Sequence, residues 1–436
     1  MTWYRWVILA VFSGIAFNCN MVVASFNALV DPMKTGFAVN EAWIIIMMTV
    51  PHIIYAPMSV VTAKMFQTFR SATVFRVAVL LMLVGSWTRI FAFVGDGMFW
   101  VLFLGNFIFV TSGPFVFNGL TLVIIAWYPE AEKSTATSII GFGAQCGSFA
   151  GMAIPGVIAM GLDKTDAKAD FNTVRSCILV ADIISTFMCV MFLLVFRAKP
   201  KHYPSKIAVE AERRSNANRN SSQWRTILVK LCHNKNYICN ATIFMIFWGI
   251  QSTMAVILTP LLSPGNYTTS ELSLVGVCFV SGGMVFLFVY GIVLDRTRAY
   301  LTAARLISTV VIFCGVAAIW IIPAGNIVIT CAWAFITGSF VLPIFTVCLP
   351  FTITLTHPIP SDAANGIMMT GSYIFATIGC LGGAALFEKA WYLGIFIFIG
   401  FVVIAFIASM LLKEPKPTVR LGEFIETEKE DEDSDL

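Results

Sequence analysis

Charged side chains are scarce in this sequence. Aspartate, glutamate, lysine and arginine make up 12% of the 436 residues, about half of the quarter that is usual in soluble domains. Hydrophobic residues make up 58% and occur in long runs, not at the spacing of an amphipathic helix or strand. This composition excludes a soluble globular protein, and we expect an integral membrane protein.

Motifs for catalysis and for ATP-driven transport are also missing. The sequence has no G-x-x-x-x-G-K-[ST] loop, so a primary pump is disfavoured. It has no H-E-x-x-H or G-x-S-x-G motif and no cluster of acids with histidine, so we expect no enzyme and no catalytic residues. The eleven cysteines form no C-x-x-C pair and lie mostly in apolar runs, so we expect packing residues, with neither a metal site nor a cofactor.

Twelve apolar runs are long enough to cross a bilayer as helices, which takes about 20 residues each. The runs lie near 5–29, 43–66, 71–94, 98–127, 133–160, 173–196, 236–262, 271–294, 300–322, 326–354, 362–387 and 391–412. The alternating ten-residue segments of a membrane barrel are not seen, and helices alone satisfy their own backbone in lipid. The fold class is therefore an all-α membrane protein.

The longest hydrophilic interruption holds ten basic residues against Glu210 and Glu212. It divides the chain into a six-helix bundle, a basic linker, a second bundle and an acidic tail, at 1–196, 197–235, 236–412 and 413–436. With both termini in the cytosol, all but six of the 28 lysines and arginines fall on the cytosolic side or in cytosolic segments. We expect membrane lipids and a small-molecule substrate as partners, no nucleic acid, and a monomer in the plasma membrane or an endomembrane.

The two halves echo each other. "YPEAEKSTATSI" precedes the fifth run and "HPIPSDAANGIM" precedes the eleventh, as in the parallel six-helix repeats of major facilitator transporters. "GIVLDRTRAY" between the eighth and ninth runs resembles the cytosolic signature of that superfamily. In it, Gly291 allows helices to approach closely, and Asp295 with Arg296 and Arg298 is expected to form a gate that breaks as the carrier changes its access.

Several blocks together resemble solute carrier family 49, which includes the feline leukaemia virus subgroup C receptor-related transporters. They are "RWVILAVFS", "GSWTR", "WYPEAEKSTATSI", "FGAQCG", "GMAIP" and "GGMVFLFVYGIVLDRTRAY". The resemblance implies uniport-like movement of a small organic solute, of a choline- or ethanolamine-like or a haem-related kind. It also implies a cage of one tryptophan and one tyrosine with two glutamines.

Of these four family positions, only the glutamine of the fifth run is kept, as Gln145. The other three fall on Val23, Val256 and Tyr373. A cation over a desolvated ring face gains up to about 2 kcal/mol, so losing both family rings weakens the case for choline. Trp248 or Phe26 could supply a replacement face.

Gln145 is also notable from the residues alone. Gly143, Gly147 and Gly151 lie on one face of the fifth helix, where small residues let a neighbouring helix approach closely. Gln145 lies about 200° round the helix from Gly143, away from that seam. Because an unpaired amide in hydrocarbon is costly, we expect it to face a polar cavity, or alternatively to bond to a neighbouring helix without contacting a ligand.

Other polar and aromatic residues inside the runs are further candidates for substrate binding. The Ser112-Gly113-Pro114 sequence is expected to break the fourth helix, with a candidate asparagine one turn beyond. Trp248 and Gln251 lie one turn apart on the same side of the seventh helix. The candidate substrate-binding residues are Gln145, Asn20, Asn118, Trp248, Gln251 and Tyr373.

Ionisable groups within the runs are few, and each is a functional hypothesis by default. Asp182, His52 and Arg89 are candidates for coupling to a proton or cation. Arg89 lies near the outer end of its helix, so it could alternatively snorkel or serve structure. Our main hypothesis is a secondary transporter of a small organic solute that works by alternating access. The alternatives are a proton-coupled carrier and a receptor or scaffold that has lost transport.

Overall fold

The computed structural model describes residues 2–413 except 27–28, 95–96, 161–166, 199, 201–223, 268, 357–358 and 360. The N-terminal half contains α1 (Thr2–Ser25), α2 (Val30–Gly36), α3 (Glu41–Thr68), α4 (Ser71–Phe91), α5 (Phe99–Val110), α6 (Gly113–Trp127), η2 (Glu130–Glu132), α7 (Lys133–Met160) and α8 (Ala167–Val195). The linker that follows contains α10 (Trp224–His233). The C-terminal half contains α11 (Lys235–Leu262), η3 (Ser263–Gly265), α12 (Thr269–Thr297), α13 (Tyr300–Ile321), α14 (Ile327–Val341), α15 (Ile344–Thr356), α16 (Ser361–Ile378), η4 (Gly379–Gly383), α17 (Ala384–Lys389) and α18 (Trp391–Leu411).

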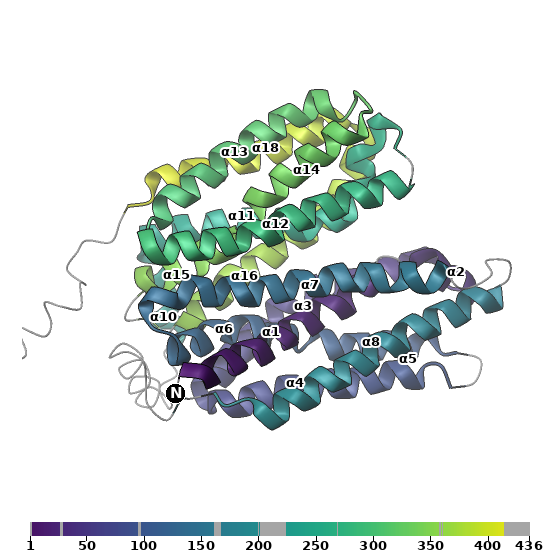
Figure 1. Cartoon of the computed structure of the whole chain (residues 1–436), viewed down its shortest axis with the longest axis horizontal. Coiled ribbons are helices and arrows are strands. Elements are labelled where there is room, and N and C mark those ends of the chain that lie inside the picture. Colours follow the sequence, from purple (N-terminus) through teal and green to yellow (C-terminus); the bar gives the residue numbers. More distant parts are fainter. Residues whose placement is uncertain are drawn as a thin grey trace, which may run out of the picture.

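The helices form two bundles that lie side by side. Figure 1 shows α1–α8 in one half and α11–α18 in the other, with the start of α1 and the end of α18 at the same end of the molecule, which we call the terminal end. Among the described residues, ten helical segments are long and apolar enough to cross a membrane. With α7 and α11, which have 28 residues each, the helical segments of membrane-spanning length number twelve among the described residues. The expected twelve-helix membrane fold is confirmed.

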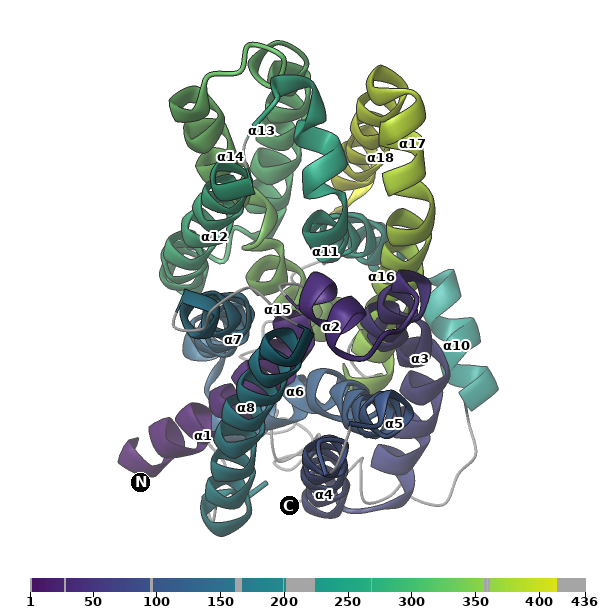
Figure 2. The same cartoon turned by 90° about the vertical axis from the view of Figure 1, so that its right-hand side faces the viewer.

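The halves meet through α3, α6 and α7 on one side and α12, α15 and α16 on the other. Figure 2 shows α15 and α16 next to these helices of the N-terminal half. The position of α16 between the halves is important below, because it carries residues that contact the other bundle.

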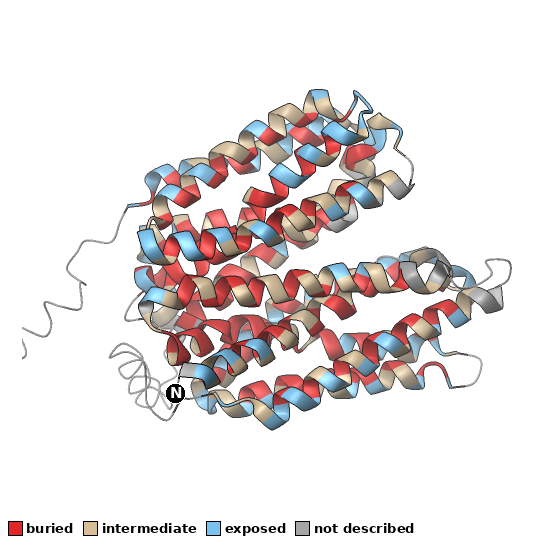
Figure 3. Cartoon of the chain, viewed as in Figure 1, coloured by how far each residue is buried: buried red, intermediate tan, exposed pale blue. Residues whose placement is uncertain are grey.

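The outer surface is apolar, as expected of helices that face lipid. Large side chains such as Leu194, Phe313 and Trp320 are exposed by 77%, 68% and 68%, and exposed positions run along the outward faces of the helices in Figure 3. Arg89 and Asp182, in contrast, are fully buried. Exposed apolar area of this extent is rare on soluble monomers.

The glycine seam of α7 packs against α1, as predicted. A Cβ atom on Gly143 would lie 2.9 Å from the Ser13 carbonyl oxygen, and one on Gly147 would lie 2.1 Å from the Phe17 carbonyl oxygen. No side chain larger than hydrogen fits at these distances. The seam therefore fixes the rotation of α7 and turns Gln145 away from α1.

Two of the twelve membrane crossings are broken near their middle. α5 ends at Val110 and α6 begins at Gly113, followed by Pro114, so the predicted break is confirmed. The C-terminal half repeats it between α14 and α15, at Leu342 and Pro343, a break that the sequence analysis missed. The first helix also ends at Ser25 and not near residue 29, and the short α2 that follows was not predicted.

Candidate functional site

A stacked pair of tyrosines joins the two halves. The rings of Tyr55 on α3 and Tyr373 on α16 lie 3.9 Å apart between centroids and are inclined by 14°. The His52 ring, one turn earlier on α3, lies 5.6 Å from Tyr373. Tyr373 was a predicted binding residue, and the structure brings it together with the predicted His52.

Asn118 on α6 holds Tyr55 in place through a hydrogen bond. Its Oδ1 accepts a hydrogen bond from the Tyr55 hydroxyl at 2.9 Å, and its Nδ2 donates to Ser59 at 2.8 Å and to Thr62 at 2.9 Å. Ser59 in turn donates to the carbonyl of Gly366 on α16 at 3.1 Å. Asn118 is fully buried and both of its amide hydrogens are used, so the expectation that it binds substrate is not favoured in this conformation. It positions Tyr55 instead.

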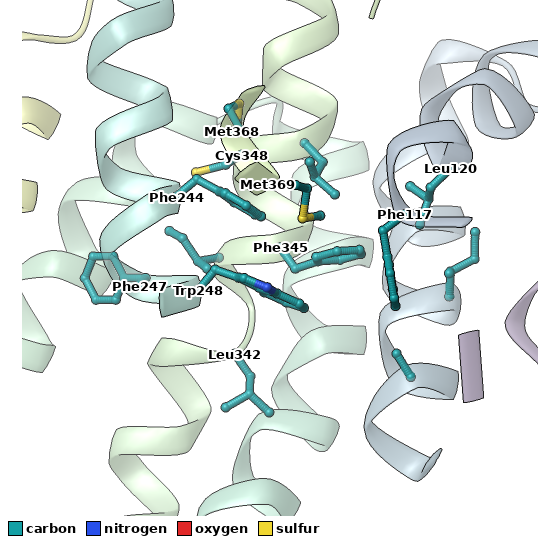
Figure 4. Packing of buried hydrophobic residues seen from close by; sticks show 14 of the residues in the cluster. Phe117, Leu120, Phe244, Phe247, Trp248, Leu342, Phe345, Cys348, Met368 and Met369 are labelled. Carbon is teal, nitrogen blue, oxygen red and sulfur yellow. The ribbon is translucent and has the colours of Figure 1, made fainter. Parts of the chain in front are cut away.

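A second group of rings comes from α11 and α15. Trp248 stacks on Phe244, one turn earlier, and lies 5.0 Å from the Phe345 ring on α15. Figure 4 shows Phe345 between Trp248 and Phe117 of α6. The Trp248 N–H lies near the Tyr373 hydroxyl without the geometry of a hydrogen bond. We call His52, Tyr55, Trp248, Phe345 and Tyr373 the central cluster.

Gln251 lies one turn beyond Trp248 on α11. Its Oε1 is buried and has no hydrogen-bond partner in the described part of the chain, and the same is true of Trp248 Nε1 and His52 Nδ1. Buried polar atoms are usually paired in folded proteins, so each exception calls for an explanation. Three such atoms in or beside one cluster indicate a place where another molecule supplies the partners.

Gln145 lies on α7, one turn beyond a residue that packs against the central cluster. Gly141, one turn earlier on the same helix face, packs against Phe345, with 3.2 Å from its would-be Cβ to the ring. Gln145 is 4% exposed, and among the described residues it makes no hydrogen bond, so the interhelical bond considered as an alternative is not present. Asn20 donates from Nδ2 to the carbonyl of Ala144 at 3.1 Å and so ties α1 to α7 beside Gln145.

The buried charges lie elsewhere. Arg89 on α4 and Asp182 on α8 form an ion pair inside the N-terminal half, with exposed fractions of 1% and 0% for their side chains. The Arg89 guanidinium also lies 4.9 Å from the Phe109 ring centroid. Arg89 does not snorkel in this structure, because its helix turns it inward to this partner, and the pairing agrees with the structural role considered as an alternative. Phe26 packs beside Arg89 and provides no ring face to the central cluster.

At the terminal end, the expected gate residues bind the other half. The Asp295 carboxylate of α12 accepts hydrogen bonds from the backbone N–H groups of Ser134 at 2.9 Å and Thr135 at 2.7 Å, which caps α7. Gly291 lets α12 approach, because a Cβ there would lie 2.2 Å from Ser138 Oγ. Arg296 and Arg298 are exposed. A gating role for the four residues remains a prediction.

The sequence of residues 7–354 matches the family model of the Major Facilitator Superfamily. The chain belongs to this superfamily. It is 22% identical over 376 residues to the choline/ethanolamine transporter flvcr2b of Danio rerio, covering 86% of this chain and 76% of that protein. It is 21% identical over 444 residues to the choline/ethanolamine transporter FLVCR2 of Homo sapiens, covering 98% and 81%. The resemblance to the feline leukaemia virus subgroup C receptor-related transporters is thus confirmed.

Solved major facilitator structures have the same fold. The proton:xylose symporter XylE superposes with a TM-score of 0.69 over 94% of this chain and 96% of that chain, at 11% identity. As a member of the superfamily, the chain is a secondary transporter with multiple membrane-spanning helices. Two bundles in contact at the terminal end, with buried polar atoms at their interface, suit alternating access of this kind.

Tyr55 and Phe345 belong to the central cluster, and the sequence analysis missed both. Phe345 is one of 38 phenylalanines and has no local signal. Tyr55 had one, since a tyrosine hydroxyl within an apolar run needs a partner when it is buried. That partner is Asn118, which had been identified for another role.

Proposed function

We propose that this protein carries a small amino alcohol of the choline and ethanolamine class by facilitated alternating access. The observation that supports this best is the central cluster, in which rings and unpaired polar atoms from α3, α11, α15 and α16 lie buried between the halves. Similarity to choline/ethanolamine transporters over most of the chain supports the substrate class. Gln145, Trp248, Gln251 and Tyr373 are the binding residues in this proposal.

The placement of the charges supports facilitated movement without an ion gradient. Asp182 is neutralised by Arg89, and the pair lies on α4 and α8, whereas the central cluster lies on α3, α11, α15 and α16. A proton-coupled carrier is the second candidate, because His52 contacts Tyr373 while its Nδ1 is buried and lacks a partner among the described residues.

We further propose that Asp295 holds the terminal end closed. Its two hydrogen bonds cross from α12 to the first turn of α7, where the positive end of the helix favours a carboxylate. Opening of this end would break both bonds. Gly291, Arg296 and Arg298 belong to the same proposed gate.

The membrane orientation is proposed from charge. With both termini in the cytosol, the basic linker and most arginines and lysines lie on the cytosolic side, in agreement with the positive-inside rule. We place the monomer in the plasma membrane or an endomembrane, with lipids around it. The linker residues 201–223 and the tail from 414 lie outside the described residues.

Transport by the purified chain in liposomes tests the function. A facilitator should bring labelled ethanolamine or choline to equal concentration on both sides, at a rate that saturates and does not respond to a pH gradient. Concentration of the label by a pH gradient would favour the proton-coupled carrier and His52. Absence of uptake across a broad panel of amines, vitamins, haem and organic anions would favour a receptor or scaffold.

A further inference from the structure

We infer that the carrier recognises its solute through hydrogen bonds to ring edges and amides, not through cation–π contacts with ring faces. It therefore prefers an amino alcohol that has free N–H groups over a quaternary ammonium compound. This inference rests on the proposed function and identifies the kind of solute that the central cluster selects.

Most ring faces of the central cluster are already covered, although Tyr373 and His52 are only half-buried. Tyr55 stacks on Tyr373 and keeps 2% of its surface exposed, while Trp248 packs against Phe244 and Phe345 and keeps 6%. A cation gains from a ring only when it lies over an open face within about 6 Å of the centroid. A methylated ammonium would have to separate rings that already stabilise one another.

Polar atoms at the edges of the same cluster, in contrast, lack partners within the part of the chain that the structure describes. Trp248 Nε1, Gln251 Oε1 and His52 Nδ1 are buried without a hydrogen-bond partner among the described residues. A buried polar atom that lacks a partner destabilises the protein, and a partner that arrives removes this cost. A solute can thus form new hydrogen bonds at the ring edges, whereas most ring faces already pack against other rings of the protein.

The donors and acceptors of these groups define the complementary solute. The indole N–H of Trp248 only donates, so it requires an acceptor such as a hydroxyl oxygen. The Oε1 of Gln251 only accepts, so it requires an N–H or O–H donor. The amide of Gln145, which has no bond to the described residues, offers one further acceptor and two donors. A small molecule with a hydroxyl and an ammonium that keeps its hydrogens matches this set.

The absence of a carboxylate from the central cluster strengthens the preference. Its members are aromatic, and the neighbouring amides are neutral. Asp182 is paired with Arg89, and this pair lies on α4 and α8. A cation here is held by neutral acceptors, each of which needs an N–H group. Methylation of the nitrogen removes these groups one at a time, and a quaternary nitrogen has none.

A methylation series tests this directly. Uptake into liposomes is measured at equal concentrations for ethanolamine, N-methylethanolamine, N,N-dimethylethanolamine and choline. We expect uptake to fall at each step, with a loss of about tenfold or more from the first to the last, because about tenfold corresponds to one hydrogen bond to a charged group. Gln251→Leu removes an acceptor for the N–H groups, so it should lower ethanolamine uptake about tenfold and flatten the series. Trp248→Phe removes the donor to the hydroxyl, which all four compounds share, so it should lower the uptake of each about tenfold and keep the order of the series.

Trp333→Phe is the matched control. Trp333 on α14 is also a buried tryptophan, but its N–H donates to the Cys314 carbonyl at 2.8 Å, away from the central cluster. This variant should keep the order of the series. The amount of folded carrier is measured for every variant, and if Trp248→Phe does not fold, Gln251→Leu and the wild-type series decide the outcome.

Uptake that rises with methylation would overturn the inference. It would also be overturned if Gln251→Leu left the series unchanged, or if Trp248→Phe left the uptake of all four compounds at the wild-type level. Uptake of another panel solute but of none in the series would also overturn it while leaving facilitated transport in place. A chain that moves no solute at all would contradict the proposed function and this inference together.

Discussion

Two buried polar regions of the molecule differ in how well they are satisfied. In the N-terminal half, Arg89 pairs with Asp182, Ser86 lies 2.9 Å from Ser185 between their hydroxyl oxygens, and Asn18 donates to Ser185 at 3.0 Å. Each of these side chains has at least one partner, although Asn18 Oδ1, Arg89 Nε and Asp182 Oδ2 are buried without one among the described residues.

Between the halves, the only polar atom of the Trp248 side chain, Nε1, is buried without a hydrogen-bond partner among the described residues, and so is Gln251 Oε1. The first region lies within one bundle, so its partners travel together. The second lies where the bundles move against each other, and a solute can complete it. The proposed site therefore depends on where its unpaired atoms lie, between the bundles, because buried atoms without a partner also occur elsewhere among the described residues, as at Asn365.

The largest expected effect comes from breaking the ion pair. Asp182→Leu leaves the Arg89 guanidinium buried without its partner, which should lower the free energy of unfolding by about 3–5 kcal/mol. Thermal unfolding of the purified protein in detergent measures this loss. The double variant Arg89→Met with Asp182→Leu should recover most of it, because an apolar pair carries no desolvation cost.

A double variant as unstable as the single one would break the comparison, since the loss would then come from packing and not from an unpaired charge. Wild-type stability of Asp182→Leu alone would do the same. Neither result is expected for side chains that are 1% and 0% exposed.

Two buried asparagines, one paired and one unpaired, allow the same comparison with smaller expected changes in stability. Asn118→Leu leaves Tyr55, Ser59 and Thr62 without their shared partner and should cost about 1–3 kcal/mol. Asn365 is equally buried, but neither of its amide atoms has a partner among the described residues. Asn365→Leu should therefore be neutral or stabilising. The unfolding midpoints of the two variants, measured side by side, check this, and an equal loss in both would contradict it.

Much of the fold followed from the sequence because bilayer physics is simple. Runs of about 20 apolar residues must become helices. The glycine repeat of α7 predicted close contact with a neighbouring helix, and the structure identifies that helix as α1. The break at Gly113 followed from proline chemistry. The break between α14 and α15 was missed although Pro343 lies there, because the two residues on each side of Pro343 are apolar and no Ser-Gly pair directly precedes it, as one does at Pro114.

The site was only partly predictable. Arg89 and Asp182 were singled out separately, but their pairing over 93 positions depends on α4 packing against α8, which no local pattern encodes. Gln145, Trp248, Gln251 and Tyr373 were identified as polar or aromatic residues within apolar runs. The stacking of Tyr373 on Tyr55 across the halves required the arrangement of the bundles.

Binding of labelled ethanolamine to three purified proteins tests the central claim most directly: wild type, the Arg89→Met with Asp182→Leu double variant, and Trp248→Phe. The account predicts that the double variant binds as the wild type does, and that Trp248→Phe binds about tenfold more weakly through the loss of one N–H. Unchanged binding in Trp248→Phe together with lost binding in a folded double variant would place the solute at the ion pair and contradict the account.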